Sequence, residues 1–376
     1  MAVDESADAA VPCRMRRAAI GFFLTCACGT SSSTPPAPGV DAGAALDAEA
    51  PAPITVTVLD RAHIGSDGNA PDFHLAKAPV KMPAGTFASA MLVVDLESPC
   101  FPFSKWKDTP PPAGQNWPAE CDAFDRNFEL ALVDPQAPKE TAGLELVRAI
   151  TPFGGPLHLE EDVTDAVLKM PAARDLAVTI PSYSDGEGKV SGSHGGWYVT
   201  AKLVLTPGTP KLALSTTSLF YGDVKASDPV PLTFEVPAGA KRTVLEYRVT
   251  GHGGATDPSS ACIGPAEEFC KRTHHVLVDG ASAGDFTPWR ADCKALCTIT
   301  KNTDGAGPSS YCAENPCGAT SSVRAPRANW CPGSKTDPIV ITQALAPGAH
   351  TASFAIDNLF AGGQWRVSMT VKSYAE

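Results

Sequence analysis

Short runs of hydrophobic residues alternate along the chain with clusters of Gly, Pro, Asp and Asn. Within several runs, apolar and polar residues alternate with a period of two, which is typical of β-strands that have one buried face. No segment shows the periodicity of a long amphipathic helix. The pattern predicts strands over residues 54–60, 90–96, 128–134, 144–150, 175–181, 197–205, 231–237, 242–251, 273–280, 338–345, 350–356 and 365–374.

A turn-rich segment, "TPGTPK" at 206–211, divides these strands into two groups. We therefore predict an all-β protein of two antiparallel sandwich domains, over 52–206 and 207–376, and the jelly roll is a natural form for such domains. Residues 281–335 have little strand signal but contain five cysteines. This region is expected to be a functional loop that disulfides hold in place.

The N-terminus has the pattern of an export signal. A basic group at 15–17 precedes the apolar run "AAIGFFL", and "TCAC" ends at Cys28. Residues 1–28 are expected to be a lipoprotein signal with lipid on Cys28, and residues 29–51 a disordered tether. A cleaved secretory signal without lipid is the alternative. Either signal sends the protein out of the cytosol, to a bacterial outer membrane, the periplasm or the medium.

Composition and charge narrow the possible partners. The 376 residues include 32 Gly and 35 Pro and carry a formal net charge of −11. An acidic surface repels phosphate backbones, so nucleic-acid binding is disfavoured. No apolar run reaches the ~18 residues of a membrane-spanning helix. Membrane attachment is therefore expected only through the N-terminal lipid.

Nine cysteines follow the proposed signal, and an exported protein is expected to pair them in disulfides. Nine is odd, so at least one thiol stays free or pairs elsewhere. The spacings of Cys293 with Cys297 and of Cys312 with Cys317 also resemble zinc-ligand pairs. An oxidising compartment disfavours that alternative.

A charged segment precedes one predicted strand in "ECDAFDRNFELALV", residues 120–133. Asp125 and Glu129 share one parity and are expected to face outward. Arg126 interrupts the alternation, so the strand is expected to start near Asn127. The opposite parity, expected to face the core, comprises Phe124, Phe128, Leu130 and Leu132. Taken alone, the segment is most simply a solvated ion pair at the end of a strand.

A second segment, "GPAEEFCKRTHHVLV" at 264–278, repeats this design of acids and an aromatic residue beside a cysteine. Upstream, His252 lies in a glycine-rich turn. Downstream, "RANWCPG" contains Arg327 and Trp330, residue types that bind sugars and amides. A turn histidine and a core tryptophan are the structural alternatives.

Taken together, "CDAFDR", "GH", "AEEFCKRTH" and "RANWCPG" resemble, in order and spacing, the peptide-N-glycosidase F family. The resemblance covers roughly residues 52–345. It implies two eight-stranded jelly rolls side by side, with the site between them. It also implies hydrolysis of the amide that joins an N-linked glycan to asparagine, in glycoproteins or glycopeptides, by a protein that is expected to be a monomer.

The resemblance also implies residue roles. Asp125 is the principal catalytic carboxylate and Glu268 the second essential acid, and Arg126 contacts the glycan or orients Asp125. One carboxylate can activate water while the other supplies a proton, so neither metal nor cofactor is required. The remaining residues expected to bind substrate are His252, Arg327 and Trp330.

The same resemblance implies disulfides Cys100–Cys121 and Cys293–Cys331. Cys262–Cys270 is inferred as a third pair, although the family's nearer partner cysteine is replaced here by Ala266. The pairing of the other loop cysteines, Cys297, Cys312 and Cys317, stays open.

The chain departs from the family pattern at two places, and the first of them, Pro181, favours a second interpretation. Pro181 in "IPSY" stands where the family has a third acid, for which Asp185 or Glu187 are possible substitutes. The loop between Cys100 and Cys121 is also longer than in the family, and it holds Trp106 and Trp117 as a possible sugar platform or shield of the cleft. A catalytically weak glycan-binding lipoprotein is therefore the alternative function.

Two other enzyme classes are disfavoured. Related double jelly rolls bind copper, but this chain has no His-x-His motif and only one methionine, Met369, in its second half. A serine hydrolase is unsupported as well, because no Gly-x-Ser-x-Gly stands at a predicted strand-to-helix turn.

Overall fold

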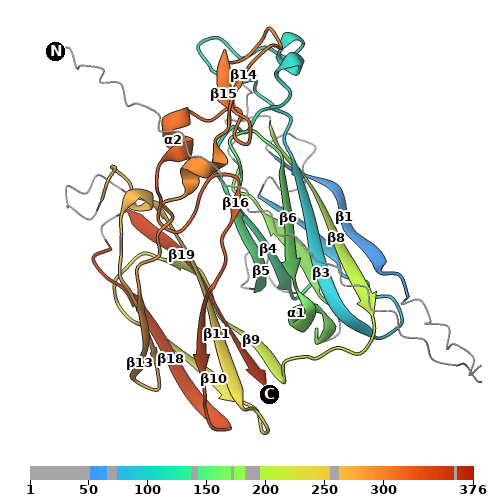
Figure 1. The fold of residues 1–376 in the computed structure, drawn as a ribbon, viewed down its shortest axis with the longest axis vertical. Helices are drawn as coiled ribbons and strands as arrows, with labels where there is room; N and C mark the ends of the chain where they lie inside the picture. Colours follow the sequence, from blue (N-terminus) through green and yellow to red (C-terminus); the bar gives the residue numbers. More distant parts are fainter. Residues whose placement is uncertain are drawn as a thin grey trace, which may run out of the picture. The chain divides into compact units, whose positions relative to one another are not determined.

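The computed structural model describes residues 51–65, 74–136, 143–170, 173–182, 195–254, 262–359 and 362–376. It confirms the predicted fold class, because two antiparallel β-sandwiches follow one another along the chain (Figure 1). The expected signal and tether, with Cys28, lie outside the described residues. So do Asp185 and Glu187.

The N-terminal sandwich contains two four-stranded sheets around one hydrophobic core, with a short fifth strand on the edge of the second sheet. The first sheet has the order β1 (Ile54–Gly65), β8 (Gly196–Pro207), β3 (Phe87–Glu97) and β6 (Leu157–Asp162). The second has the order β16 (Ser334–Lys335), β5 (Leu144–Ile150), β4 (Asn127–Val133), β7 (Asp175–Thr179) and β2 (Leu75–Pro79).

The C-terminal sandwich encloses a separate core. One of its sheets has the order β17 (Ile339–Gln343), β11 (Arg242–Gly253), β19 (Gly363–Tyr374) and β9 (Ser215–Val224). The other has the order β10 (Val230–Val236), β18 (Gly348–Ile356), β12 (His274–Val278) and β13 (Ala281–Phe286).

Both sandwiches share one topology when their eight main strands are counted in chain order. One sheet joins the first, eighth, third and sixth strands, and the other joins the second, seventh, fourth and fifth. This arrangement is the jelly roll. Equivalent positions in the two halves can therefore be compared strand by strand.

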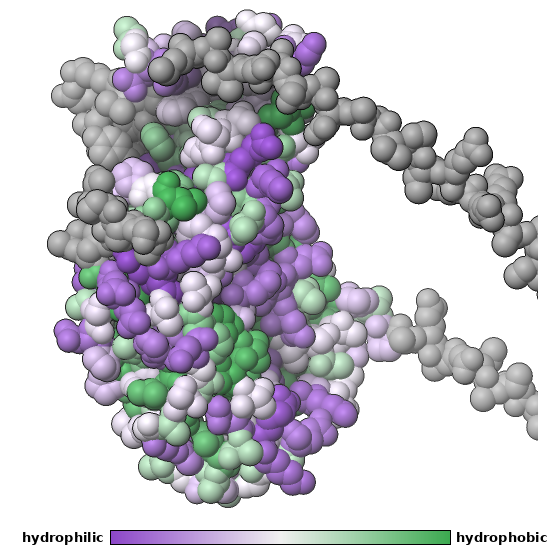
Figure 2. Space-filling model, turned by 60° about the vertical axis from the view of Figure 1, so that its left-hand side comes forward, coloured by the Kyte–Doolittle hydropathy of each residue, from purple (hydrophilic) through white to green (hydrophobic). Residues whose placement is uncertain are grey.

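The remaining elements are short: η1 (Phe103–Lys107), α1 (Thr164–Leu168), η2 (Glu267–Phe269), η3 (Cys293–Leu296), β14 (Ile299–Lys301), β15 (Ser310–Cys312) and α2 (Thr320–Arg324). None of the helices in the described residues is long and apolar enough to cross a lipid bilayer. Figure 2 shows hydrophilic residues over much of the visible face, with a group of hydrophobic residues in its lower half.

Each of the twelve predicted segments forms a strand, but four of the main strands were missed: β2, β6, β9 and β13. All four lie at the edge of a sheet. An edge strand packs on fewer neighbours and keeps more polar residues, as in "LHLEED" of β6. Hydrophobic alternation is therefore weakest where these strands lie.

Two predicted orientations in and before β4 were wrong. Glu129 was expected to face solvent, but only 3% of its surface is exposed. Phe124 was expected in the core, but it is half-buried and packs against Trp117 at the surface end of the segment. Glu129 is buried because the outer face of this sheet contacts the other sandwich, a contact that the alternation within one strand does not show.

A buried charge network joins the two sandwiches. Arg148 on β5 binds Glu145 at 2.8 Å and donates to the backbone oxygen of Arg366 on β19 at 2.6 Å. Arg248 on β11 binds Glu145 at 3.2 Å, and Arg366 binds Glu129 at 2.8 Å. The network therefore connects β4 and β5 of one sandwich to β11 and β19 of the other.

We expect Glu145→Ala to destabilise the protein by about 3–5 kcal/mol, because it removes the buried carboxylate that binds both Arg148 and Arg248. Glu97→Ala is the matched control, since Glu97 pairs with Arg61 at the exposed surface and its loss should cost less than about 1 kcal/mol. Urea unfolding of both variants measures the difference. Equal midpoints for the two variants would contradict a structural role for the network.

The structure forms four disulfides. Two of them, Cys100–Cys121 and Cys293–Cys331, are the pairs that the resemblance implies, and a third is the inferred pair Cys262–Cys270. The fourth joins Cys297 to Cys312. Cys293, Cys297 and Cys312 are thus all in disulfides, so they offer no thiolates for the zinc site considered as an alternative. Disulfides are characteristic of proteins from oxidising compartments.

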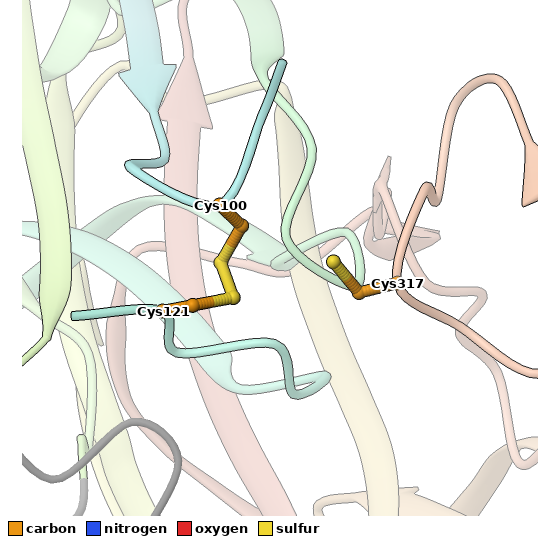
Figure 3. A group of neighbouring side chains, drawn as sticks. All are labelled: Cys100, Cys121 and Cys317. Carbon is orange, nitrogen blue, oxygen red and sulfur yellow. A yellow bond between two sulfur atoms is a disulfide. The ribbon is translucent and has the colours of Figure 1, made fainter. Parts of the chain in front are cut away.

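Cys317 is a free, buried thiol that lies close to the Cys100–Cys121 disulfide (Figure 3). The three sulfur atoms are within 4.8 Å of one another. Burial raises the pKa of the Cys317 thiol to about 12, which keeps it protonated and unreactive at neutral pH.

Alkylation followed by peptide mapping without reduction tests this pairing. In the folded protein we expect Cys317 to resist alkylation, because it is buried and protonated. In denaturant it should be the one labelled cysteine among the nine of the described part. A linkage of Cys317 to Cys100 or Cys121 would contradict the pairing.

Candidate active site

Two acids from different sandwiches meet on one arginine. Arg327 Nη1 lies 2.8 Å from Glu268 Oε1, and Arg327 Nη2 lies 3.6 Å from Asp125 Oδ2. The arginine side chain is 1% exposed, whereas those of the acids are 23% and 24% exposed. The two carboxylates are therefore partly exposed to solvent, whereas the arginine that binds both of them is buried.

The segment before β4 holds Asp125 through its backbone. The Thr151 hydroxyl donates to the carbonyl of Phe124 at 2.7 Å and accepts from the backbone N–H of Arg126 at 2.8 Å. The Thr151 N–H in turn donates to the carbonyl of Arg126. Both peptide neighbours of Asp125 are thus hydrogen-bonded to one residue, which leaves its carboxylate in a defined position.

Asp122 holds the same segment in place through its buried side chain. It is fully buried and binds Arg126 Nε and Nη2 at 3.2 Å, and Trp197 Nε1 donates to it at 3.4 Å. Arg126 also lies over the Phe124 ring. The sequence offered no role for Asp122, and the structure identifies it as the partner of Arg126.

The segment before β12 holds Glu268 in a similar way. Glu267 is fully buried, where it binds Arg272 at 2.8 Å and accepts from Trp365 Nε1 at 2.9 Å. The Cys262–Cys270 disulfide closes the segment. The backbone oxygen of Glu268 accepts from Ala328 N–H at 2.7 Å, which ties it to the segment that carries Arg327.

The two segments that carry Asp125 and Glu268 occupy equivalent places in the jelly-roll topology. Each acid lies in the connection that enters the fourth strand, β4 or β12, and each anchoring acid binds an arginine and a tryptophan. The two tryptophans, Trp197 and Trp365, belong to the eighth strands, β8 and β19. A pair of acids with an arginine four or five residues later is the sequence signal that would have identified Asp122 and Glu267.

Arg327 is fixed on several sides. Its Nη2 donates to the backbone oxygen and the hydroxyl of Ser322, both at 3.0 Å. The guanidinium lies over the rings of Phe269 at 4.8 Å and Trp330 at 4.5 Å. A buried cation with this many contacts does not need to reorganise when charge develops beside it.

The electrostatics of the pair favour proton transfer near neutral pH. Burial raises the pKa of Asp125 to about 6, although Arg327 lowers it, while the nearby Glu268 raises it further. Burial likewise raises the pKa of Glu268, against the opposing effect of Arg327. Two carboxyl groups with raised pKa values in one site are typical of acid–base catalysis.

The other residues singled out in the sequence surround this centre. Trp330 is 1% exposed, lies beneath Arg327 and donates from Nε1 to the carbonyl of Gly251 at 2.8 Å. His252 stacks on Trp330 and bonds the Thr250 hydroxyl at 2.8 Å. Burial lowers the pKa of His252 to about 3, so its imidazole is neutral at physiological pH.

Pro181 lies just after β7 and is exposed. The residues considered as substitutes for a third acid, Asp185 and Glu187, are outside the described part of the chain. The described site therefore contains two acids, one arginine, and the aromatic residues packed around that arginine.

Comparison with known proteins relates the C-terminal half of the chain to a family. Residues 220–375 match the family model described as "Peptide-N-glycosidase F, C terminal". No curated protein sequence matches the chain.

Solved structures share the fold over most of the chain. PNGase F, a glycosylasparaginase from Flavobacterium meningosepticum, is 16% identical with a TM-score of 0.60, over 86% of this chain and 96% of its own. A structure of a peptide-N(4)-(N-acetyl-β-D-glucosaminyl)asparagine amidase gives 16% identity and a TM-score of 0.59, over 86% and 97%. PNGF-II is 19% identical with a TM-score of 0.60, and the chain spans 66% of its length.

Proposed function

We propose that this chain is an amidase of the peptide-N-glycosidase F family, whose C-terminal model its residues 220–375 match and whose solved structures share the fold of both sandwiches. Its substrate is the amide that joins an N-linked glycan to asparagine in glycoproteins or glycopeptides. The observation that carries this proposal is the convergence of Asp125 and Glu268 on Arg327.

The proposed mechanism assigns different roles to the two acids. Ionised Asp125 takes a proton from water, whose oxygen attacks the amide carbonyl. Glu268 acts on the side of the carbonyl or the leaving group, where an acid of raised pKa can donate a proton to the departing nitrogen. The C–N bond then breaks and releases aspartate in the peptide and a glycosylamine, which water converts to free sugar and ammonia.

Arg327 keeps the two carboxylates together in this mechanism. Ionisation of both acids would place two like charges in one site, and the guanidinium between them offsets that repulsion. Arg126 orients the Asp125 segment through Asp122, and Trp330 and His252 support Arg327 from below. No step requires a metal ion or a cofactor.

The proposal includes an exported protein. Four disulfides support an oxidising compartment, and the N-terminal sequence supports a signal with lipid on Cys28. The protein acts as a monomer whose two domains span 52–206 and 207–376.

The second candidate function is glycan binding with little or no turnover. Pro181, in place of the family's third acid, is the observation that favours it. A glycopeptide that binds without being hydrolysed would distinguish this candidate from the amidase.

Asp125→Asn and Glu268→Gln are each expected to lower the rate of deglycosylation by about 100-fold or more, because each removes an acid–base group. The assay incubates a denatured N-glycoprotein with the enzyme and follows the gain of roughly 1 Da at the glycosylated asparagine by mass spectrometry. Asp95→Asn, which alters an exposed acid on β3, is the control and should keep full activity. An unmodified asparagine with the wild-type protein would refute the amidase, and undiminished rates in Asp125→Asn would refute the catalytic role of Asp125.

Activity should also depend on pH in a defined direction. Asp125 must be ionised to act as a base, so kcat/KM should fall about tenfold per pH unit below its pKa of about 6. Arg327 lowers that pKa, so Arg327→Met should move the acidic limb to higher pH, with a smaller shift in Arg327→Lys. Arg61→Met, at an exposed ion pair, should leave the limb in place. An acidic limb that Arg327→Met does not move would contradict the assignment of Asp125.

A further inference from the structure

A cavity of about 940 Å³ lies between two loops near the acid pair. One wall comes from the loop between Cys100 and Cys121, and the other from residues 306–322 of the C-terminal half. Its volume is in the range of small-molecule binding sites. The cavity is therefore large enough to take one or more side chains of a bound molecule.

Contacts between the two loops hold the walls in place. Phe103 packs edge-to-face on Tyr311 with ring centroids 5.0 Å apart, and this contact joins the loops, which lie side by side (Figure 1). The Ser104 N–H donates to Asp304 at 3.3 Å. A rigid cavity loses little conformational entropy when a ligand binds.

The buried part of the lining is apolar. Trp106, Ala123 and Pro316 are buried, and Trp106 Nε1 already donates to the carbonyl of Cys100 at 2.9 Å. Three half-buried rings extend this apolar surface: Trp117, Phe124 and Phe153. Apolar groups that enter the cavity are thus removed from water on several sides.

Polar groups contribute less to the buried part of the lining. Asn116 and Ser310 are exposed, and the Ser322 hydroxyl accepts from Arg327 at 3.0 Å. No charged side chain is among the described residues that line the cavity. A charged group that entered it would therefore lose water without gaining an ion-pair partner.

Two residues make this cavity continuous with the acid pair. Phe124 lines the cavity and immediately precedes Asp125 in the chain. Ser322 lines it as well and bonds Arg327 through its hydroxyl and its backbone oxygen. Adjacent Cα atoms of a peptide are about 3.8 Å apart. A side chain one or two residues from the asparagine under attack would therefore reach the cavity.

Because the cavity adjoins the bond to be cleaved, its occupant belongs either to the glycan or to the peptide. A sugar against the apolar floor would leave some of its hydroxyls without hydrogen-bond partners. An apolar side chain would gain from the same burial.

From these observations we infer that the cavity binds an apolar side chain of the peptide, one or two residues from the glycosylated asparagine. The enzyme then selects its substrates by peptide sequence as well as by glycan. This inference rests on the proposed function for the identity of the substrate.

Glycopeptides that share one glycan and differ at a single residue beside the asparagine test the inference. We expect kcat/KM of the wild type to be about tenfold higher with leucine than with alanine at that residue, because the larger apolar side chain is buried. Aspartate there should give a lower kcat/KM than alanine, because the described lining offers its charge no partner.

Two variants change the cavity from opposite walls. Trp117→Ala removes an apolar ring, and Ala319→Leu fills part of the cavity from an exposed position. Each should lower the preference for leucine over alanine to about twofold, as expected when the buried contact is lost. Ala313→Leu is the matched control, because it makes the same change at an exposed residue outside the lining and should keep the wild-type preference.

The possible outcomes separate the inference from the amidase itself. Equal hydrolysis of the leucine and alanine glycopeptides by wild type would overturn the inference and leave the amidase standing. A leucine preference that persists in both cavity variants would overturn it as well, because the selection would then come from elsewhere. Weaker binding of the free glycan by Trp117→Ala, without any effect of peptide sequence, would assign the cavity to sugar and overturn the inference.

If wild type hydrolyses none of the glycopeptides, the amidase is refuted and calorimetry with the unglycosylated peptides tests the cavity by itself. Tighter binding of the leucine peptide than of the alanine peptide, with the difference lost in Trp117→Ala, would support the peptide site. Equal affinities of the two peptides for wild type would overturn it.

Discussion

The buried charge network between the sandwiches is the constraint on which the rest of the site depends. Glu129, Glu145 and Arg148 on one side, with Arg248 and Arg366 on the other, are removed from water and keep each other's charges satisfied. Removing one partner of a buried ion pair destabilises a protein by roughly 3–5 kcal/mol. These side chains therefore tolerate little displacement. The network therefore defines how β4 and β5 face β11 and β19, and with that where the two acids meet.

Each sandwich then presents its acid in the same way. A buried carboxylate, Asp122 or Glu267, takes the hydrogen bonds of an arginine and a tryptophan, while a second carboxylate, Asp125 or Glu268, stays at the surface. These two different roles explain why each motif contains two acids. One acid of each pair holds the segment, and the other is available for chemistry.

Much of the fold could be predicted from the chain, and the reason is physical. Interior strands bury one face and show the alternation in their sequence, as β8 and β19 do. Edge strands such as β6 and β13 are half-exposed, and their polar residues hide the pattern. Glu129 was assigned to solvent because alternation identifies the side of a sheet but not what lies against it.

The sequence was sufficient for the strands of the two cores and for the segments that carry Asp125, Glu268 and Arg327, because periodicity and short motifs are local properties. Only the tertiary structure decided that these three residues share one centre, since their contacts span both sandwiches. It also decided that Asp122 and Glu267 are anchors, because burial and partners distinguish two acids that look alike in the chain.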